Sequence, residues 1–371
     1  MYIESIQLYN FRNYDKLELA PHRGTSVIYG KNGSGKTNLL EAVHFSCFGR
    51  SQRSRQDRDM MRLEQSESAV KIRTRRCDGR HEVELRMRYQ GRLQKSVLVY
   101  GKRVERISEM FGHSTCVLFS PEDMDIIKGG PTERRRFMDM QLSQMRPTYL
   151  NVLSDYIKAL KSRNILLKSA AMGRAAEAEL EVWEQQMARR GAEIVQQRQW
   201  FLGLLNEIAA PIYRELSGSA DESFLLYYAG SLKQDESPME SLLHNLKSGR
   251  AADIRRQQTS FGPHRDDMDC RLNGHPMKEF ASQGQMRTAV LAMKLAMIRM
   301  IQGEMGELPI LLLDDVFSEL DLRRRRALLG YIKNIQSFIT CTDKSDLADA
   351  HVDCFLHVEN IEGKARLRVE K

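Results

Sequence analysis

Long apolar stretches are absent from this chain of 371 residues. The most apolar helical stretch, residues 289–301, is interrupted by Lys294 and Arg299, so it falls short of the roughly 20 apolar residues that a membrane-spanning helix needs. The first residues lack the basic and then apolar pattern of a signal peptide, and the chain has no internal repeat or low-complexity tract. These absences predict a soluble globular protein, which we expect in the cytoplasm.

Cysteine is sparse, and the six cysteines stand singly, without a Cys-x-x-Cys pair or a neighbouring cluster of histidines. They are Cys47, Cys77, Cys116, Cys270, Cys341 and Cys354. This spacing is typical of free thiols in a reducing compartment rather than of a disulfide framework.

Aromatic residues make up only 7% of the chain and do not alternate with arginines, which argues against a surface that stacks nucleic-acid bases. Basic residues exceed acidic ones by 57 to 49, and arginines gather in short segments. These segments hold Arg50, Arg53, Arg55 and Arg58; Arg73, Arg75 and Arg76; Arg134 to Arg136; and Arg323 to Arg326. Arginine forks fit phosphate oxygens, so a nucleic acid bound through its backbone is favoured. For each segment alone, a solvated charged surface is an equal alternative.

Residues 1–120 alternate apolar and polar side chains with a period of two, which is typical of strands with one buried face. Turns at Asp78-Gly79 and Gln90-Gly91 separate these predicted strands. After residues 261–263 the chain returns to short, apolar, strand-like segments. This pattern predicts that the C-terminal part of the chain completes the first domain.

Residues 132–217 follow helical spacing instead. The segment interrupts the strand-rich pattern and predicts an inserted helical arm. Pro147, Gly173 and Pro211 predict breaks in its helices, which argues against a long coiled coil.

A phosphate-binding loop is the most specific motif of the chain. It has a glycine, four free positions and then Gly-Lys-Thr, and its residues are Gly30, Lys31, Asn32, Gly33, Ser34, Gly35, Lys36 and Thr37. A predicted strand precedes it at residues 25–29 and a predicted helix follows at residues 38–48. The glycines let backbone N–H groups face phosphate oxygens, Lys36 reaches the terminal phosphates, and Thr37 ligates Mg²⁺. The motif leaves open the class of NTPase.

A second part of the nucleotide site follows the predicted buried strand at residues 309–313, which ends in Asp314 and Asp315. Ligands lie off the carboxyl ends of parallel strands, so we expect Asp314 beside the phosphate loop, holding Mg²⁺. Asp315 then polarises an attacking water. We assign Lys36, Asp314 and Asp315 as catalytic residues, and Thr37 and Asp314 as metal ligands. A helix-capping role for one aspartate is the simpler alternative.

Ser282-Gln283-Gly284-Gln285 precedes a predicted helix at residues 286–301. A helix N-terminus with a serine and a glycine offers unpaired N–H groups and a partial positive charge, so it predicts a second anion site. An ordinary capped core helix is the alternative. The position of the motif between the phosphate loop and the carboxylate strand favours the anion site.

Together these segments resemble the ABC-type ATPase heads of DNA-repair and chromosome-structure proteins, and among them most closely the RecF family of bacterial recombination proteins. The resemblance covers nearly the whole chain. Besides the phosphate loop and Ser282 to Gln285, it rests on Leu8 to Tyr14, Phe119 to Asp123, Gly129 to Asp139, Gly262 to Asp267, Arg287-Thr288, and Asp314-Asp315 followed by Ser318 to Asp321. So many segments in one order make the match specific.

The resemblance implies an α/β fold, the ABC-type P-loop ATPase head with mixed sheets and helices, carrying an inserted helical arm. We place the two parts of the ATPase domain at residues 1–125 and 259–371 and the arm at residues 126–258. The family further implies a head-to-head homodimer in which ATP on one subunit is capped by residues 282–285 of the other. Such a dimer clamps DNA, hydrolyses ATP slowly with stimulation by DNA, and works at the nucleoid with RecO and RecR to load RecA at gaps.

The same resemblance extends the set of site residues. The nucleotide-binding residues that it adds to the loop are Arg12, Asn38, Ser282, Gly284 and Gln285. Residues 120–123 correspond to the loop that links the nucleotide to the arm, and Asp321 communicates across the dimer. The arginines to which we assign DNA contacts are Arg50, Arg53, Arg55, Arg58, Arg134 and Arg135.

The chain departs from transporter-type ABC heads at three places. Asp315 stands where those heads carry a glutamate, Gln283 where they carry a glycine, and residues 340–343 where they carry a switch histidine. The last difference puts the hydrolysis switch in doubt and is compatible with weak turnover.

Other functions compete with this interpretation. A GTPase is suggested by residues 343–346, Asp-Lys-Ser-Asp, but the first position of the guanine-reading motif does not match, and Asp314 does not begin an Asp-x-x-Gly sequence. A transporter ATPase would need a membrane partner. A non-hydrolysing, nucleotide-switched DNA clamp, or another SMC-like DNA-repair ATPase, is the remaining alternative.

Overall fold

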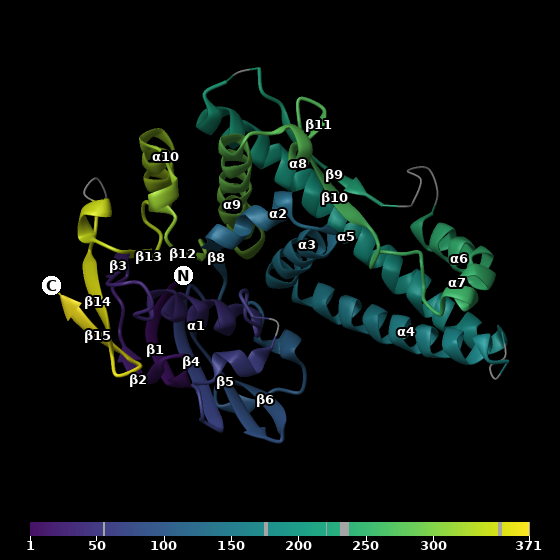
Figure 1. Ribbon diagram of the computed structural model, residues 1–371, viewed down its shortest axis with the longest axis horizontal. Coiled ribbons are helices and arrows are strands. Elements are labelled where there is room, and N and C mark those ends of the chain that lie inside the picture. Colours follow the sequence, from purple (N-terminus) through teal and green to yellow (C-terminus); the bar gives the residue numbers. More distant parts are fainter. Residues whose placement is uncertain (55, 174–176, 220, 231–236, 348–350, 371) are drawn as a thin grey trace. The chain divides into compact units, whose positions relative to one another are not determined.

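The computed structural model describes residues 1–54, 56–173, 177–219, 221–230, 237–347 and 351–370, so Arg55 lies outside the described residues. The chain forms two compact units (Figure 1). The head unit holds Met1–Met124, Pro211–Ala220 and Gln283–Lys371. The arm unit holds Asp125–Ala210 and Asp221–Ser282.

The head unit contains an antiparallel sheet with the strand order β2-β1-β4-β5-β6-β7. Its strands are β1 (Tyr2–Phe11), β2 (Tyr14–Leu19), β4 (Glu67–Arg76), β5 (Gly79–Gln90), β6 (Arg92–Val99) and β7 (Lys102–Arg103). The predicted turns are confirmed, because β4 and β5 meet at Gly79 and β5 and β6 meet at Gly91. The predicted alternation is also present, since Leu85 and Met87 of β5 are buried whereas Arg86 is exposed.

The second sheet of the head unit has the order β15-β14-β3-β13-β12-β8, and only β15 runs antiparallel to its neighbour. Its strands are β3 (Thr25–Tyr29), β8 (Cys116–Phe119), β12 (Ile310–Leu313), β13 (Ser337–Cys341), β14 (Cys354–Ile361) and β15 (Lys364–Glu370). Every residue of β12 and β13 is buried, as expected for parallel strands covered on both faces. The carboxyl ends of β3, β12 and β13 therefore share one edge, which carries the candidate site.

Besides the last turns of α5, the described part of the head unit contains the α-helices α1 (Lys36–Phe48), α9 (Gln283–Met305) and α10 (Leu322–Ile332). Helix α1 contacts strands of both sheets and is buried from Leu39 to Phe48, so its apolar residues are not confined to one face. It ends at Gly49, whose φ of 66° is the left-handed conformation that favours glycine. Short 3₁₀ turns lie at Asp57–Met60, Ile107–Met110, Pro121–Met124, Phe317–Glu319 and Lys344–Leu347.

The arm unit is mainly helical, as the sequence predicts. Its helices are α2 (Asp125–Lys128), α3 (Pro131–Met145), α4 (Pro147–Ala171), α5 (Glu177–Ser217, of which the last turns belong to the head unit), α6 (Pro238–Ser248), α7 (Arg250–Arg256) and α8 (Met277–Phe280). It also has a small sheet of β9 (Phe224–Ala229), β10 (Asp267–Leu272) and β11 (His275–Pro276). Because β10 pairs with β9, residues 259–282 lie with the arm unit, whereas the sequence pattern grouped them with the ATPase domain.

One predicted helix break is wrong. Pro211 lies inside α5, a helix of 41 residues that continues past the proline to Ser217. A proline removes one helical hydrogen bond, but packing on both sides outweighs that loss here, because Ala209, Ile212 and Tyr213 are buried. Pro147, by contrast, begins α4, and Gly173 follows its end. None of the described helices is both long and apolar enough to span a membrane.

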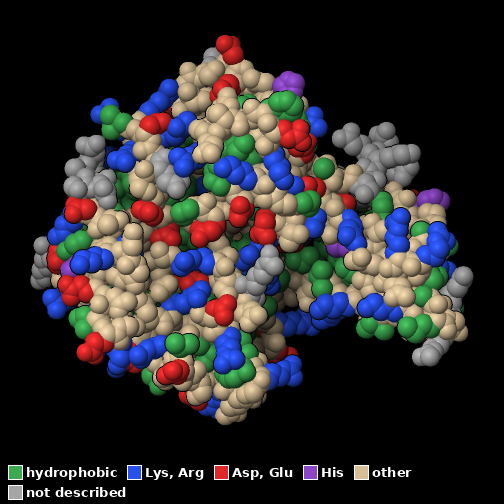
Figure 2. Space-filling model, in the orientation of Figure 1, with side chains coloured by type: hydrophobic (Ala, Val, Ile, Leu, Met, Phe, Trp, Pro, Cys, Tyr) green, Lys and Arg blue, Asp and Glu red, His purple; other side chains and the backbone are tan. Residues whose placement is uncertain are grey.

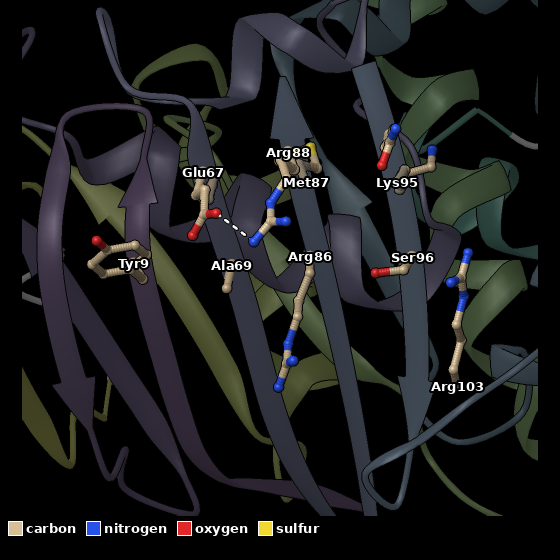
Figure 3. Close-up of a pocket in the computed structure, with 11 residues that line it drawn as sticks. Tyr9, Glu67, Ala69, Arg86, Met87, Arg88, Lys95, Ser96 and Arg103 are labelled. Carbon is tan, nitrogen blue, oxygen red and sulfur yellow. Dashed lines mark ion pairs between the residues drawn. The ribbon is translucent and has the colours of Figure 1, made fainter. Parts of the chain in front are cut away.

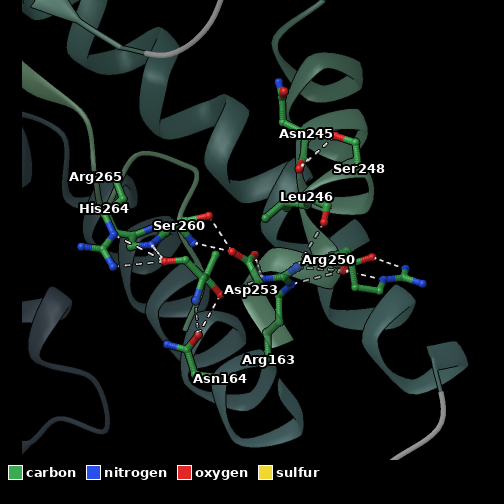
Figure 4. A network of polar contacts seen from close by, with 12 residues as sticks. Arg163, Asn164, Asn245, Leu246, Ser248, Arg250, Asp253, Ser260, His264 and Arg265 are labelled. Carbon is green, nitrogen blue, oxygen red and sulfur yellow. Dashed lines mark hydrogen bonds and ion pairs between the residues drawn. The ribbon is translucent and has the colours of Figure 1, made fainter. Parts of the chain in front are cut away.

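A buried arginine organises the arm unit (Figure 4). The Arg163 side chain on α4 is fully buried and pairs with Glu184 of α5 at 3.0 Å and with Asp253 of α7 at 2.7 Å. It also donates to Thr259 Oγ1 at 2.8 Å. A buried charge is tolerated when its hydrogen bonds are met, so this network fixes three helices against one another.

Candidate nucleotide site

The phosphate loop connects β3 to α1, and its backbone requires glycine at two positions. Gly30 has a φ of 146°, and a side chain there would place Cβ 2.2 Å from the Val358 carbonyl oxygen. Gly35 has a φ of 119°, and Cβ would come within 2.8 Å of Asn13 Oδ1. Both conformations are strained for residues with a side chain. The backbone conformation of the phosphate loop therefore depends on glycine at positions 30 and 35.

Two residues at the turn from β1 into β2 support the backbone of the phosphate loop. Asn13 Nδ2 donates to the Ser34 carbonyl at 2.9 Å, and the buried Tyr14 hydroxyl donates to the Gly35 carbonyl at 3.1 Å. Asn38 Nδ2 donates to Asn13 Oδ1 at 2.9 Å, so this predicted nucleotide-binding residue supports the loop in the present structure. Asn13 and Tyr14 lie in the Leu8 to Tyr14 segment on which the resemblance rests, but no supporting role was predicted for them, because their contacts with the loop come from a distant part of the chain.

Lys36, the first residue of α1, turns back toward the loop. Its Nζ donates to the carbonyls of Gly30 at 2.6 Å and Lys31 at 3.1 Å. Burial lowers the pKa of Lys36, and the negative charges of Asp315 and Asp314 oppose that shift. The ammonium group is thus held at the loop, where phosphate oxygens could replace the two carbonyls.

Asp314 follows β12 and meets two hydroxyl groups. Thr37 Oγ1 and Thr340 Oγ1 each donate to Asp314 Oδ1 at 2.8 Å. Burial raises the pKa of Asp314, while these hydrogen bonds lower it. A threonine hydroxyl and a carboxylate are the hard oxygen ligands that Mg²⁺ prefers, so Thr37 and Asp314 fit a metal ion at this point.

Asp315 has an unusual backbone. Its φ of 52° lies in the left-handed region, which is uncommon for residues other than glycine. Its N–H donates to Thr340 Oγ1 at 2.9 Å, and the residue is exposed. The strained turn directs the chain so that two neighbouring carboxylates occupy different environments, one buried and one open to solvent.

A small hollow beside Thr37 and Asp314 brings in residues that the sequence did not assign to the nucleotide. It is also lined by Gln52, Arg53 and Glu122. Arg53 Nε lies 3.8 Å from Glu122 Oε1, and its charge acts to lower the pKa of Asp314. Arg53, predicted to contact DNA, therefore lies at the nucleotide site instead of on a separate surface.

Arg12, predicted to contact phosphate, is engaged within the chain. Its Nε and Nη2 donate to the two carboxylate oxygens of Glu41 at 2.8 and 2.7 Å, and Nη1 donates to the Asp59 carbonyl at 2.6 Å. Glu41 lies one turn after Thr37 on α1. The ion pair thus anchors Arg12 against the helix that follows the phosphate loop.

The predicted second anion site begins α9. Ser282 and Gln283 are exposed, and Gly284 and Gln285 lie in the first turn of α9. The Gly284 carbonyl accepts from Arg324 Nη2 at 3.3 Å, and the same guanidinium pairs with Asp321. We call Ser282 to Gln285 the signature turn. Arg324 thus links Gly284 of this turn to Asp321, two residues predicted to act across a dimer.

The remaining arginines assigned to DNA differ in exposure. Arg50 and Arg58 are exposed, and Arg58 stacks on the Tyr89 ring at 3.7 Å. Arg134 forms a double hydrogen bond to Asp267 at 2.7 Å and is largely buried, and Arg135 donates to a backbone carbonyl. These two arginines stabilise the arm unit, which leaves them little freedom to bind phosphate. On the face seen in Figure 2, basic and acidic side chains are interspersed.

The family model described as the RecF/RecN/SMC N terminal domain matches residues 2–364. The chain is 38% identical over 354 residues to the DNA replication and repair protein RecF of Lachnoclostridium phytofermentans, covering 95% of this chain and 96% of that protein. It is 41% identical over 353 residues to the RecF of Symbiobacterium thermophilum, covering 94% and 93%.

A solved structure also matches: the recombination mediator protein RecF–ATP in the RecFOR pathway is 33% identical, with a TM-score of 0.90. The alignment covers 99% of this chain and 97% of that one. The sequence and the fold agree over nearly the whole length. This chain therefore belongs to the RecF family of DNA replication and repair proteins.

Proposed function

We propose that the chain binds ATP with Mg²⁺ at the phosphate loop and hydrolyses it slowly, with stimulation by DNA. The hydrogen bond of 2.8 Å between Thr37 Oγ1 and Asp314 Oδ1 carries this proposal. It joins the phosphate loop to the carboxylate strand across 277 residues of sequence. The solved relative named RecF–ATP supports ATP as the nucleotide.

Each residue of the site has a role in the proposed reaction. When ATP binds, Lys36 Nζ gives up its hydrogen bonds to the carbonyls of Gly30 and Lys31 and donates to phosphate oxygens instead. Its positive charge then offsets the negative charge that develops on those oxygens. Mg²⁺, held by Thr37 and Asp314, would neutralise the phosphate oxygens further. Asp315 orients a water molecule that attacks the γ-phosphorus, while the bond to the ADP oxygen breaks.

We also propose that ATP joins two copies of the chain head to head. The exposed Ser282 and the first turn of α9 offer N–H groups and the positive end of a helix dipole to an anion. Arg324 ties Gly284 to Asp321 and so presents both to the same partner. ATP on one copy is then capped by the signature turn of the other.

DNA is the proposed macromolecular ligand of the ATP-bound dimer, at gaps or at junctions of single strand and duplex. RecO and RecR are the proposed partners in loading RecA. Support comes from relatives named DNA replication and repair proteins and from the solved relative of the RecFOR pathway. Arg50 and Arg58 are exposed cations suited to backbone phosphates. An ATPase domain in two parts with an inserted helical arm is our proposed organisation, and we now extend the arm to residue 282 because residues 221–282 lie in the arm unit.

Phosphate release tests the proposed enzyme activity. It is measured for the wild-type chain and for Lys36→Met, with and without duplex DNA. We expect slow release that rises with DNA and is lost in the variant, because Lys36 no longer offsets phosphate charge. Release no greater than that of Lys36→Met under both conditions would exclude hydrolysis.

A non-hydrolysing clamp is the second candidate function. It is favoured by Thr340, which is buried and bonded to Asp314 in the segment where transporter-type heads carry their switch histidine. A clamp of this kind would retain ATP-dependent DNA binding without phosphate release. The same measurement, combined with DNA binding, separates the two functions.

A further inference from the structure

The outer face of the antiparallel sheet has a composition unlike that of the inner face. Along β5, Leu85 and Met87 are buried and alternate with Arg86 and Arg88. The side chains of these two arginines are 58% and 57% exposed. The same register continues across the sheet, because Ala69 pairs with Arg86 and Tyr9 pairs with Ala69. One face thus forms core, and the other presents charged side chains to solvent.

A hollow of about 440 Å³ lies on this outer face (Figure 3). Tyr9, Ala69, Arg86 and Ser96 occupy one cross-strand row on β1, β4, β5 and β6. Ala69, between Tyr9 and Arg86, and Ser96, on the far side of Arg86, are both small, so the surface dips on either side of the Arg86 side chain. The row therefore creates a depression with an aromatic side chain at one end and a basic side chain toward the other.

The hollow has a basic wall. Arg86 pairs with Glu84 through Nε at 2.5 Å, and Arg88 pairs with Glu67 at 2.6 Å. Arg103, on the terminal strand β7, also lines the hollow and makes no ion pair with any other described residue. Arginines that keep exposed N–H groups beside such pairs can still bind an anion through their guanidinium forks.

Basic residues also outnumber acidic ones over the whole outer face, as read from the strand register. The basic residues are Lys16, Lys71, Arg73, Arg75, Arg80, Arg86, Arg88, Arg92 and Arg103, and the acidic ones are Glu4, Glu18, Glu67, Glu82 and Glu84. This excess favours a polyanion over a neutral or cationic ligand.

The exposed ring of Tyr9 favours a single-stranded nucleic acid over a duplex. The Tyr9 side chain is 50% exposed on a face that carries mainly charged side chains. An exposed ring on a sheet, flanked by cations, is the arrangement with which proteins stack unpaired bases. The bases of a duplex are already stacked on one another, so a duplex could offer this face only its backbone.

We propose that the hollow binds single-stranded DNA, with a base stacked on Tyr9 and backbone phosphates on Arg86 and Arg103. Strands lie about 4.8 Å apart, so Tyr9 and Arg86 are separated by about 10 Å across two strand spacings, and Arg103 lies about as far again. A DNA strand that crosses the sheet can meet all three. The inference rests on the proposed DNA-binding function, but it does not depend on ATP or on dimerisation.

Fluorescence anisotropy of a labelled oligothymidylate of about 20 nucleotides tests the proposal, with full-length protein and no ATP. We expect Tyr9→Ala to weaken binding by about fivefold or more, because stacking of a base on an aromatic ring is lost. Tyr9→Phe should bind as the wild type does. Arg103→Ser should reduce the slope of log affinity against log salt by about 0.7, the value for one phosphate contact on a single strand.

Arg80→Ser is the matched control, because Arg80 lies on the same sheet face, is 72% exposed and does not line the hollow. ATP binding by each variant reports that the head unit is folded. Unchanged oligothymidylate affinity in Tyr9→Ala, with an unchanged salt slope in Arg103→Ser, would overturn the proposal. If duplex binding with ATP persists in that case, the proposed clamp function stands. If the wild-type chain binds neither probe, the proposed DNA-binding function fails as well.

Discussion

The hydroxyl of Thr340 donates a hydrogen bond of 2.8 Å to the carboxylate of Asp314. The same oxygen accepts the N–H of Asp315 at 2.9 Å. One buried residue of β13 thus orients the proposed metal ligand and the backbone of the proposed water-orienting residue. From these two hydrogen bonds we infer a positioning role for Thr340, which the sequence did not predict.

Thr340→Val tests this relationship. Valine keeps the shape of threonine but removes the hydroxyl, and a hydrogen bond to a charged group contributes about 1.5 kcal/mol or more. We expect ATP hydrolysis to fall about tenfold, since 1.4 kcal/mol corresponds to a factor of ten. ATP affinity should change little, because the phosphate loop is intact. Thr340→Ser should restore the rate, and equal rates for the valine and wild-type proteins would contradict the positioning role.

Arg324→Ala tests the link between the signature turn and Asp321. The guanidinium donates to Thr288 Oγ1 at 2.7 Å and to the Gly284 carbonyl at 3.3 Å. Alanine at position 324 removes the guanidinium that contacts both the Gly284 carbonyl and the Asp321 carboxylate. We expect ATP-driven dimerisation, measured by sedimentation, to weaken about tenfold, the loss of about 1.4 kcal/mol in a charge-assisted hydrogen bond.

The matched control for this variant is Arg326→Ala, which removes an exposed arginine two residues further along α10. Nucleotide binding by the monomer should be unchanged in both variants. If the two variants dimerise equally well, Arg324 is a surface charge without a role in presenting the signature turn.

Because His264 is largely buried, we expect the stability of the arm unit to depend on pH. His264 Nδ1 lies 2.6 Å from the Tyr156 hydroxyl, and its Nε2 lies 3.2 Å from the Thr259 carbonyl. Burial lowers the pKa of His264 from 6.5 to about 4, the Thr259 carbonyl opposes this, and the charges of Arg265 and Arg135 add to it. The neutral ring therefore belongs to the folded state.

Above pH 6.5 the ring is neutral in both states and contributes no pH dependence. As the pH falls from 6.5 toward 4, the unfolded chain binds a proton first, so folding loses up to about 3 kcal/mol. His264→Gln should remove that part of the slope when the unfolding midpoint in denaturant is followed against pH. Parallel slopes for the two proteins over this range would show that His264 does not titrate as proposed.

The sequence predicts those parts of the site that depend on local pattern. Glycine spacing predicts the phosphate loop, and a buried strand ending in carboxylates places Asp314 near Thr37, because parallel strands align their carboxyl ends. Both features depend on a few neighbouring residues. The same is true of the turns at Gly79 and Gly91.

Other features depend on contacts between distant segments, and these the sequence could not supply. Arg53 and Arg50 belong to one arginine cluster, but only Arg53 lines the nucleotide hollow. Pro211 is tolerated in α5 because of the residues that pack around it. Tyr9 gains neighbouring arginines only through strand pairing, so a stacking surface was not expected from the spacing of aromatics along the chain.

The central claim, that a second copy completes the ATP site, is tested most directly by mixing two inactive variants. Lys36→Met disables the phosphate loop, and Ser282→Arg blocks the signature turn. If the two parts act in trans, a mixed dimer has one site with an intact loop and an intact signature turn, so phosphate release should recover when the variants are combined. If both parts act within one chain, every chain carries a defect, and a mixture no more active than the two variants measured separately would contradict the account.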